Sequence, residues 1–358
     1  MHIPDGYLSP QTCAVGFVVA APMLATAAVR VKRRVKTRNV PTLAVLAAVS
    51  FLIMMFNVPI PDGTTAHAVG AALIAILLGP WAATIAVTVA LAFQALLFGD
   101  GGVLAFGVNV VNMAIVMPWV AYGAYKLVSR GATLTAPRRI VAAFLAGYAG
   151  INASALCAAA ELGIQPDLFH DAAGAPLYSP YHLAQTVPAM MLAHLTVAGL
   201  AEGILSAAVL AYLQRANLPL LRANHPGVPV DAAAATAEQK RRRRLRPGVV
   251  AVAVMAVLVV LTPLGLLAPG GAFGEDSPAD LQSSLGLSAV PTGLARYSDL
   301  WQSALFPDYL SGSPWTYVVS AVVGIVVVGL VVHGAGLLLV RLLNRRATEP
   351  RERVEASR

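Results

Sequence analysis

Charged residues are scarce in this sequence. Asp, Glu, Lys and Arg make up only 12% of its 358 residues, whereas 58% are hydrophobic. A soluble domain has roughly 25% charged and roughly 45–50% apolar residues, so the composition excludes an ordinary soluble domain and favours an integral membrane protein. Cysteine is also rare. Cys13 and Cys157 both lie inside apolar runs, which predicts small core residues and implies no disulfide framework.

The sequence also lacks the motifs of common enzymes. No G-x-x-x-x-G-K-[ST] occurs, which excludes a Walker-type ATPase, and H-E-x-x-H, C-x-x-C and G-x-S-x-G are absent too. Few carboxylates fall inside apolar segments, Glu161 and Glu202 being the main ones. We therefore expect no enzyme, with no catalytic residues and no residues that bind a resident cofactor.

The basic residues that are present cluster beside apolar segments. Lys and Arg number 25 against 17 Asp and Glu, and they concentrate in the runs 30–38, 240–246 and 341–346. Such runs are typical of cytoplasmic loops that follow the positive-inside rule. They are compatible with contact to anionic membrane lipid, and we expect no nucleic-acid binding.

Apolar segments near the length of a membrane span recur along the chain. They cover residues 11–29, 40–56, 67–79, 80–98, 103–126, 138–161, 183–213, 248–268 and 316–340. With the amino terminus outside, nine helices place the basic loops inside and the acidic loops outside. The pattern predicts an all-α, multi-pass protein of the bacterial cytoplasmic membrane with a cytoplasmic carboxy terminus. Because no basic region precedes the first apolar run, we expect no cleaved signal peptide.

A polar segment divides the chain into two parts. Residues 214–247 are rich in Pro, Gly and basic residues and show no apolar period, which predicts a basic cytoplasmic linker. We expect a seven-helix metal-binding core in residues 1–213 before it. A two-helix hairpin module with an outside loop is expected in residues 248–346, followed by a polar cytoplasmic tail in 347–358.

The first residues, "MHIPDGYLSP", contain the elements of a metal chelator. The amine of Met1, the deprotonated amide nitrogen of His2 and the Nδ1 atom of its imidazole can close fused five- and six-membered rings on one metal ion. Square-planar nitrogen ligation suits Ni²⁺ and Cu²⁺. His67, expected on the same side of the membrane, is a candidate for the fourth position. The alternatives are a histidine at position two by chance and a helix-terminal His67 with ordinary hydrogen bonds.

Three polar residues surround His67 in the sequence. Asn57, Thr64 and Thr65 could orient the imidazoles by hydrogen bonds outside the ligand set. Alternatively, the loop is only capped, with Thr64 or Thr65 as N-cap of the third helix.

Polar residues also interrupt the later apolar segments. Asn109 and Asn112 are expected to form hydrogen bonds between helices. His194 and Glu202 are expected about 80° apart around the seventh helix. We expect them to form a buried polar brace; the alternative is a transit site for metal.

Four stretches carry a family resemblance: "MHIPDGYLSP", "VPIPDGTTAHAVGAALIAILLGPWAA", "FQALLFGDGGVLAFGVNVVNM" and "HLTVAGLAEGILSA". Over about residues 1–213 the chain resembles CbiM/NikM, the substrate-capture component of cobalt/nickel transporters of the energy-coupling-factor class. The resemblance implies a metal site formed by Met1, His2 and His67. It also implies a transmembrane coupling subunit and two ATPase subunits on separate chains as partners.

The carboxy-terminal part resembles the small auxiliary component CbiN/NikN, here fused to the core. "SPADLQSSLG" and "ALFPDYL" are similar to a Pro-Asp-Gly-Leu-Glu version usual in nickel systems, but Ala279 and Gln282 replace the Gly and Glu. We therefore predict the metal-capture component of an importer of Ni²⁺ or Co²⁺ and leave the choice of metal open. The alternatives are a stand-alone secondary carrier and a membrane metal sensor that does not transport.

Overall fold

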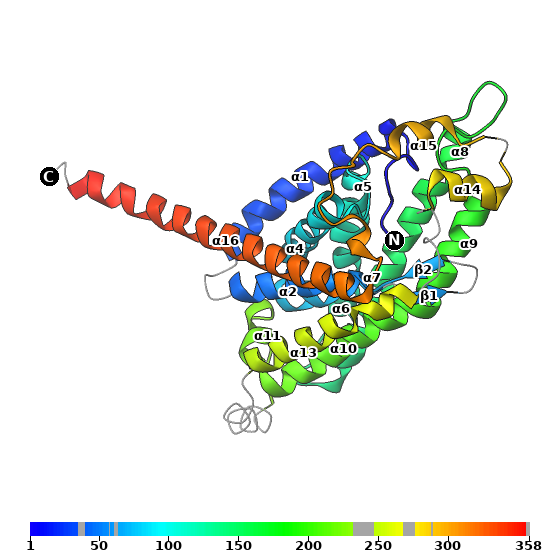
Figure 1. Cartoon of the computed structure of the whole chain (residues 1–358). Coiled ribbons are helices and arrows are strands. Elements are labelled where there is room, and N and C mark those ends of the chain that lie inside the picture. Colours follow the sequence, from blue (N-terminus) through cyan, green and yellow to red (C-terminus); the bar gives the residue numbers. More distant parts are fainter. Residues whose placement is uncertain are drawn as a thin grey trace.

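The computed structural model describes residues 1–34, 40–56, 58–60, 64–231, 247–267, 276–287 and 289–355. Helices dominate this part of the chain, as predicted, and surround the amino-terminal segment (Figure 1). In the first half the elements are α1 Pro10–Arg34, α2 Val40–Met54, β1 Val58–Ile60, β2 Thr64–Ala66, α3 Ala71–Leu78, α4 Pro80–Phe93, η2 Gln94–Phe98, α5 Phe106–Asn109, η3 Val110–Val116 and α6 Met117–Val128.

The second half of the chain completes the bundle and then returns to it. Its elements are α7 Pro137–Gly163, α8 Gln165–Leu168, α9 Leu183–Ala193, η4 His194–Ala198, α10 Gly199–Ala216, α11 Leu218–Asn224, α13 Pro247–Leu261, η5 Thr262–Leu267, α14 Pro278–Leu285, α15 Thr292–Tyr297, η6 Pro307–Leu310 and α16 Pro314–Glu355. Helix α7 packs between α6 and α10, and α16 packs along α2 before it extends away from the bundle (Figure 1).

The membrane character of the fold follows from helix length and composition. Within the described ranges six helical runs are long and apolar enough to cross a membrane: Pro10–Lys32, Pro80–Phe98, Phe106–Val128, Pro137–Leu168, Leu183–Ala216 and Pro314–Leu338. The apolar helices Val40–Met54 and Val252–Leu267 are shorter. The protein is therefore an all-α membrane protein, whereas the predicted division into seven and two spanning helices stays a prediction.

The third predicted helix is much shorter than expected. It was predicted over residues 67–79, but α3 has only 8 residues and begins at Ala71. Its N-cap residue is Gly70, whose φ of 76° lies in the left-handed region that favours glycine. His67 therefore lies in the non-helical segment between β2 and α3, and the alternative that Thr64 or Thr65 caps the helix is wrong.

Strands β1 and β2 form a small antiparallel hairpin that the sequence did not predict. Ile60 pairs with Thr64 and Val58 with Ala66. The hairpin carries the chain from the end of α2 to His67, which follows β2 directly.

The beginning of the predicted linker is folded. Helix α11 lies within the range 214–247, and its Leu218 and Leu221 are buried. Asn224 donates hydrogen bonds of 3.3 and 3.0 Å to the carbonyls of Ala75 and Ile76 at the end of α3. This first part of the range thus packs against the core.

Candidate metal site

The amino-terminal segment lies inside the helical bundle, where Figure 1 places the N-terminus between the surrounding helices. Met1 is 4% exposed, His2 5% and Ile3 2%. A chain end carries polar groups that favour water, so its burial requires specific partners. The described contacts of Ile3 and Asp5 supply several of these.

Asn109 fixes the backbone of Ile3 by two hydrogen bonds. The Ile3 N–H donates to Asn109 Oδ1, and Asn109 Nδ2 donates to the Ile3 carbonyl, both at 2.9 Å. The Gly102 N–H donates to the same carbonyl at 2.9 Å. A Cβ on Gly102 would lie 2.1 Å from Asp5 Oδ1, so this close approach requires glycine. The predicted helix-to-helix role of Asn109 is therefore replaced by a contact to the amino-terminal segment.

Asp5 holds the segment at its other end. Its Oδ2 accepts from the Val103 N–H at 3.0 Å, and its Oδ1 accepts from Leu104 and Ala105 at 2.8 and 3.1 Å. These amides precede α5, where backbone N–H groups lack partners within the helix. Burial raises the pKa of the Asp5 carboxyl, and the three hydrogen bonds oppose that shift.

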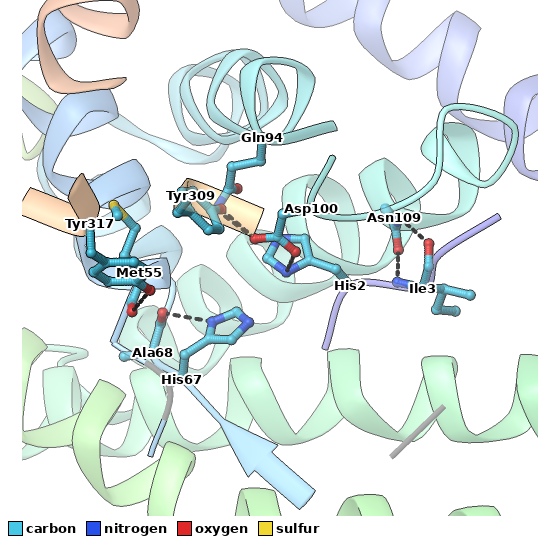
Figure 2. Close-up of polar contacts among 10 residues, drawn as sticks. All are labelled: His2, Ile3, Met55, His67, Ala68, Gln94, Asp100, Asn109, Tyr309 and Tyr317. Atoms are coloured by element: carbon cyan, nitrogen blue, oxygen red, sulfur yellow. Dashed lines mark hydrogen bonds and ion pairs between the residues drawn. The ribbon is translucent and has the colours of Figure 1, made fainter. Parts of the chain in front are cut away.

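His67 reaches the same place from the segment after β2, whereas His2 comes from the amino-terminal segment (Figure 2). It is 3% exposed, and its Nδ1 lies 3.1 Å from the carbonyl of Ala68. Its Nε2 has no hydrogen-bond partner among the described residues. Burial lowers the pKa of His67 well below its ordinary value, and the nearby positive charge of the terminal amine lowers it further. The imidazole is therefore neutral, the form in which it can bind a metal.

Glu202 positions the segment that carries His67. Its Oε2 accepts from the N–H groups of Val69 and Gly70, both at 2.8 Å, and its Oε1 accepts from Ala72 at 3.3 Å. A buried carboxylate thus caps α3 from a distant helix, which confirms the predicted polar brace for Glu202.

The rings of His2 and His67 lie together. Their centroids are 5.0 Å apart, and their planes are inclined by 22°. A metal lies about 2 Å from an imidazole nitrogen, and thus about 3 Å from the ring centre, so two adjacent ligands have centroids about 4.5 Å apart. The observed spacing is close to what one shared ion requires.

The other predicted residues are placed differently. Asn57 lies outside the residues that the structure describes. Thr64 and Thr65 belong to β2, and the structure describes their backbone but not their side chains. Asn112 donates to Glu161 Oε2 at 2.6 Å, which links η3 to α7 as predicted for a contact between helices. His194 is buried; its Nδ1 lies 2.7 Å from the Met190 carbonyl, whereas its Nε2 has no partner among the described residues.

Two residues near the imidazoles were not predicted as site residues. Asp100 Oδ1 lies 3.2 Å from His2 Nδ1, and Tyr309 donates a hydrogen bond to Asp100 Oδ2 (Figure 2). Asp100 lies in the stretch "FGDGG", where the flanking glycines are a signal of close backbone approach. Tyr309 carries no such signal, because it reaches the site from the carboxy-terminal part of the chain.

Comparison with known proteins identifies the family. A family model described as the cobalt uptake substrate-specific transmembrane region, CbiM, matches residues 2–220. The fused nickel transport protein NikMN of Rhodobacter capsulatus is 48% identical over 97% of this chain and 100% of the relative. The probable fused nickel transport protein LarMN of Lactiplantibacillus plantarum is 43% identical over 93% of this chain and 97% of the relative.

Further matches cover smaller shares of the chain. The cobalt transport protein CbiM of Propionibacterium freudenreichii is 40% identical over 36% of this chain and 55% of the relative. A crystal structure of a truncated transition metal transporter is 54% identical, with a TM-score of 0.56, and covers 60% of this chain and 98% of that chain. These relatives are transport proteins and not enzymes. The chain therefore belongs to the CbiM family and, like its fused relatives, continues beyond the family region in a NikN-like carboxy-terminal part.

Proposed function

We propose that this protein captures Ni²⁺ or Co²⁺ for import at the outer face of the cytoplasmic membrane. The observation that carries the proposal is the buried pair of imidazoles, His2 and His67, beside the amino terminus. The ligands would be the amine of Met1, the amide nitrogen and Nδ1 of His2, and the imidazole of His67. Four nitrogens in a plane match the preference of Ni²⁺.

The donor set explains how a site can form here with few side chains. Among the described residues there is no cluster of three or more His, Cys, Asp or Glu side chains able to hold a metal. The proposed chelate takes two donors from the terminal amine and the backbone, so two imidazoles complete it. For His67, the Nε2 atom without a hydrogen-bond partner among the described residues is the available ligand, while Nδ1 contacts the Ala68 carbonyl.

Nickel is the first choice of substrate. Two relatives that cover more than nine-tenths of this chain are named nickel transport proteins, whereas the named cobalt transporter matches over 36% of it. Co²⁺ can enter similar nitrogen sites and is the second choice.

Import requires an energy source that this chain does not encode. The sequence contains no Walker motif, so we infer a transmembrane coupling subunit and two ATPase subunits as partners. The basic runs support an orientation with the amino terminus outside and the carboxy terminus inside. Residues 1–213 would form the metal-binding domain and residues 248–346 the fused auxiliary module, with 214–247 joining them and 347–358 as the tail.

Two measurements test this function together. Isothermal titration of the full chain with an unmodified amino terminus should give one tight site for Ni²⁺ and a weaker one for Co²⁺. Cells that express the chain alone should accumulate little nickel, and co-expression of the coupling and ATPase subunits should restore uptake. Concentrative uptake by the chain alone would instead indicate a secondary carrier, and tight binding without uptake in either case would indicate a sensor.

A further inference from the structure

A carboxylate faces the amino-terminal imidazole. Asp100 Oδ1 lies 3.2 Å from His2 Nδ1, the atom that closes the six-membered chelate ring in the proposed function (Figure 2). The Asp100 side chain is 21% exposed, and that of His2 is 4% exposed. Asp100 is therefore the more solvent-accessible partner of this pair.

The second oxygen of Asp100 is held by two other side chains. Tyr309 donates a hydrogen bond to Oδ2, and Gln94 Nε2 lies 3.4 Å from it. Gln94 Nε2 also donates to Tyr309 Oη at 2.9 Å. Gln94 and Tyr309 are both buried. The carboxylate is thus oriented by one residue of the core and one of the carboxy-terminal module, with Oδ1 left to face His2.

The backbone around Tyr309 has an uncommon conformation. Asp308, Tyr309 and Leu310 have positive φ values of 49°, 55° and 55°. Such values are uncommon for residues other than glycine, and they persist where surrounding contacts impose them. Ser320 of α16 donates a hydrogen bond of 2.7 Å to the Tyr309 carbonyl, which is one such contact.

The charges of the proposed chelate do not balance without this carboxylate. A divalent metal brings two positive charges, the deprotonated amide of His2 offsets one, and the amine and the imidazoles are neutral ligands. One positive charge remains in a site whose imidazoles are nearly inaccessible to water. An uncompensated buried charge is costly, and the carboxylate of Asp100 would make the site neutral.

We propose that Asp100 is the counter-charge of the metal site and that Tyr309 and Gln94 are positioning residues that keep it there. The inference rests on the proposed function and deepens it. In the metal-bound site the Asp100 carboxylate would face the single positive charge that the metal and the His2 amidate leave together, in surroundings largely inaccessible to water. Loss of the charge, or of its positioning, should therefore weaken metal binding.

The test compares four variants of the full chain with its native amino terminus by isothermal titration with nickel. Asp100→Asn should lower the affinity by about 10-fold or more, because partners outside the ligand set typically contribute about 10- to 100-fold. Tyr309→Phe should lower the nickel affinity by a smaller factor than Asp100→Asn does. When it is added to Asp100→Asn, Tyr309→Phe should cause no further loss of affinity. Tyr317→Phe is the matched control: this buried phenol donates to the Met55 carbonyl at 2.8 Å and should leave the affinity unchanged.

A spectroscopic measurement distinguishes the loss of the Asp100 charge from a disruption of the four-nitrogen ligand set. At saturating nickel, the visible absorption band of Asp100→Asn should match that of the wild type, because all four nitrogen ligands remain. Wild-type affinity in Asp100→Asn, or an equal loss from Tyr309→Phe in both backgrounds, would overturn the proposal while leaving the proposed function intact. An unchanged Tyr309→Phe would overturn the positioning role even if Asp100→Asn did not fold. Absence of nickel binding by the wild type would overturn both.

Discussion

The imidazoles of His2 and His67 stack with their centroids 5.0 Å apart, although they belong to distant segments of the chain. Each is brought there by a different buried polar side chain. Asn109 fixes the backbone next to His2, and Glu202 fixes the backbone that follows His67. The geometry of the candidate site therefore depends on hydrogen bonds to main-chain groups as well as on the two rings.

Asn109→Ala should weaken nickel binding by about 10-fold, the lower end of the effect of partners outside the ligand set. The variant removes both hydrogen bonds to Ile3, so the amino-terminal segment would no longer be held for chelation. Titration with nickel measures the change. Asn112→Ala is the control, because Asn112 bonds to Glu161 and not to the amino terminus; an equal loss of affinity in both variants would contradict the anchoring role.

His67→Ala should lower affinity for nickel and cobalt by more than about 100-fold, beyond the range of partners outside the ligand set, because it removes a ligand. The protein should remain folded in detergent. His194→Ala removes another buried imidazole and should retain high affinity. Unchanged binding by His67→Ala would show that His67 is not a ligand.

Glu202→Ala should destabilise the metal-free protein. The substitution leaves the buried amides of Val69, Gly70 and Ala72 without their acceptor, and each unsatisfied group costs about 1–3 kcal/mol. Thermal unfolding in detergent should show a clearly lower midpoint. Glu202→Gln retains one acceptor oxygen and should lie between Glu202→Ala and the wild type. A wild-type midpoint for Glu202→Ala would exclude the capping role.

His225 should make stability depend on pH. Burial, followed by the charge of Arg139, lowers its pKa from 6.5 to about 4. Because the unfolded chain binds the proton more readily, this contribution to stability is complete above pH 6.5 and is lost as the pH falls towards about 4. The loss amounts to about 3 kcal/mol. Unfolding midpoints of metal-free protein should fall more in this range for the wild type than for His225→Gln; parallel curves would contradict the prediction.

The sequence was most informative where it contains long apolar segments or metal-binding residue types. Apolar segments predicted most helices, and the motif stretches predicted that His2 and His67 share one site, in agreement with their stacked rings. The helix after His67 was predicted to begin at residue 67, but it begins at Ala71. The residues between are apolar and fit a helical pattern. The start of the helix is instead set by the left-handed conformation of Gly70 and by its hydrogen bond to Glu202.

Long-range contacts account for the remaining differences. His225 lies in a polar stretch that looks like linker, yet it is buried against Ile76 and Tyr125. Asp100 was not predicted as a site residue, because nothing nearby in the sequence indicates its contact with Tyr309. Such pairings depend on how distant helices pack, which local sequence patterns do not encode.

The most direct test is to extend the amino terminus by several residues. Such an extension converts the Met1 amine into an ordinary amide and moves the free amine too far from His2 to close a chelate ring with it, while all side chains remain. Nickel titration should be compared for the unextended chain, the extended chain with its added residues verified by mass spectrometry, and a chain tagged at the carboxy terminus. We expect tight binding by the first and third proteins. The second should lose more than about 100-fold in affinity, which exceeds the effect of partners outside the ligand set. Full affinity in the verified extended chain would contradict the terminal chelate and require His67 to act with other ligands.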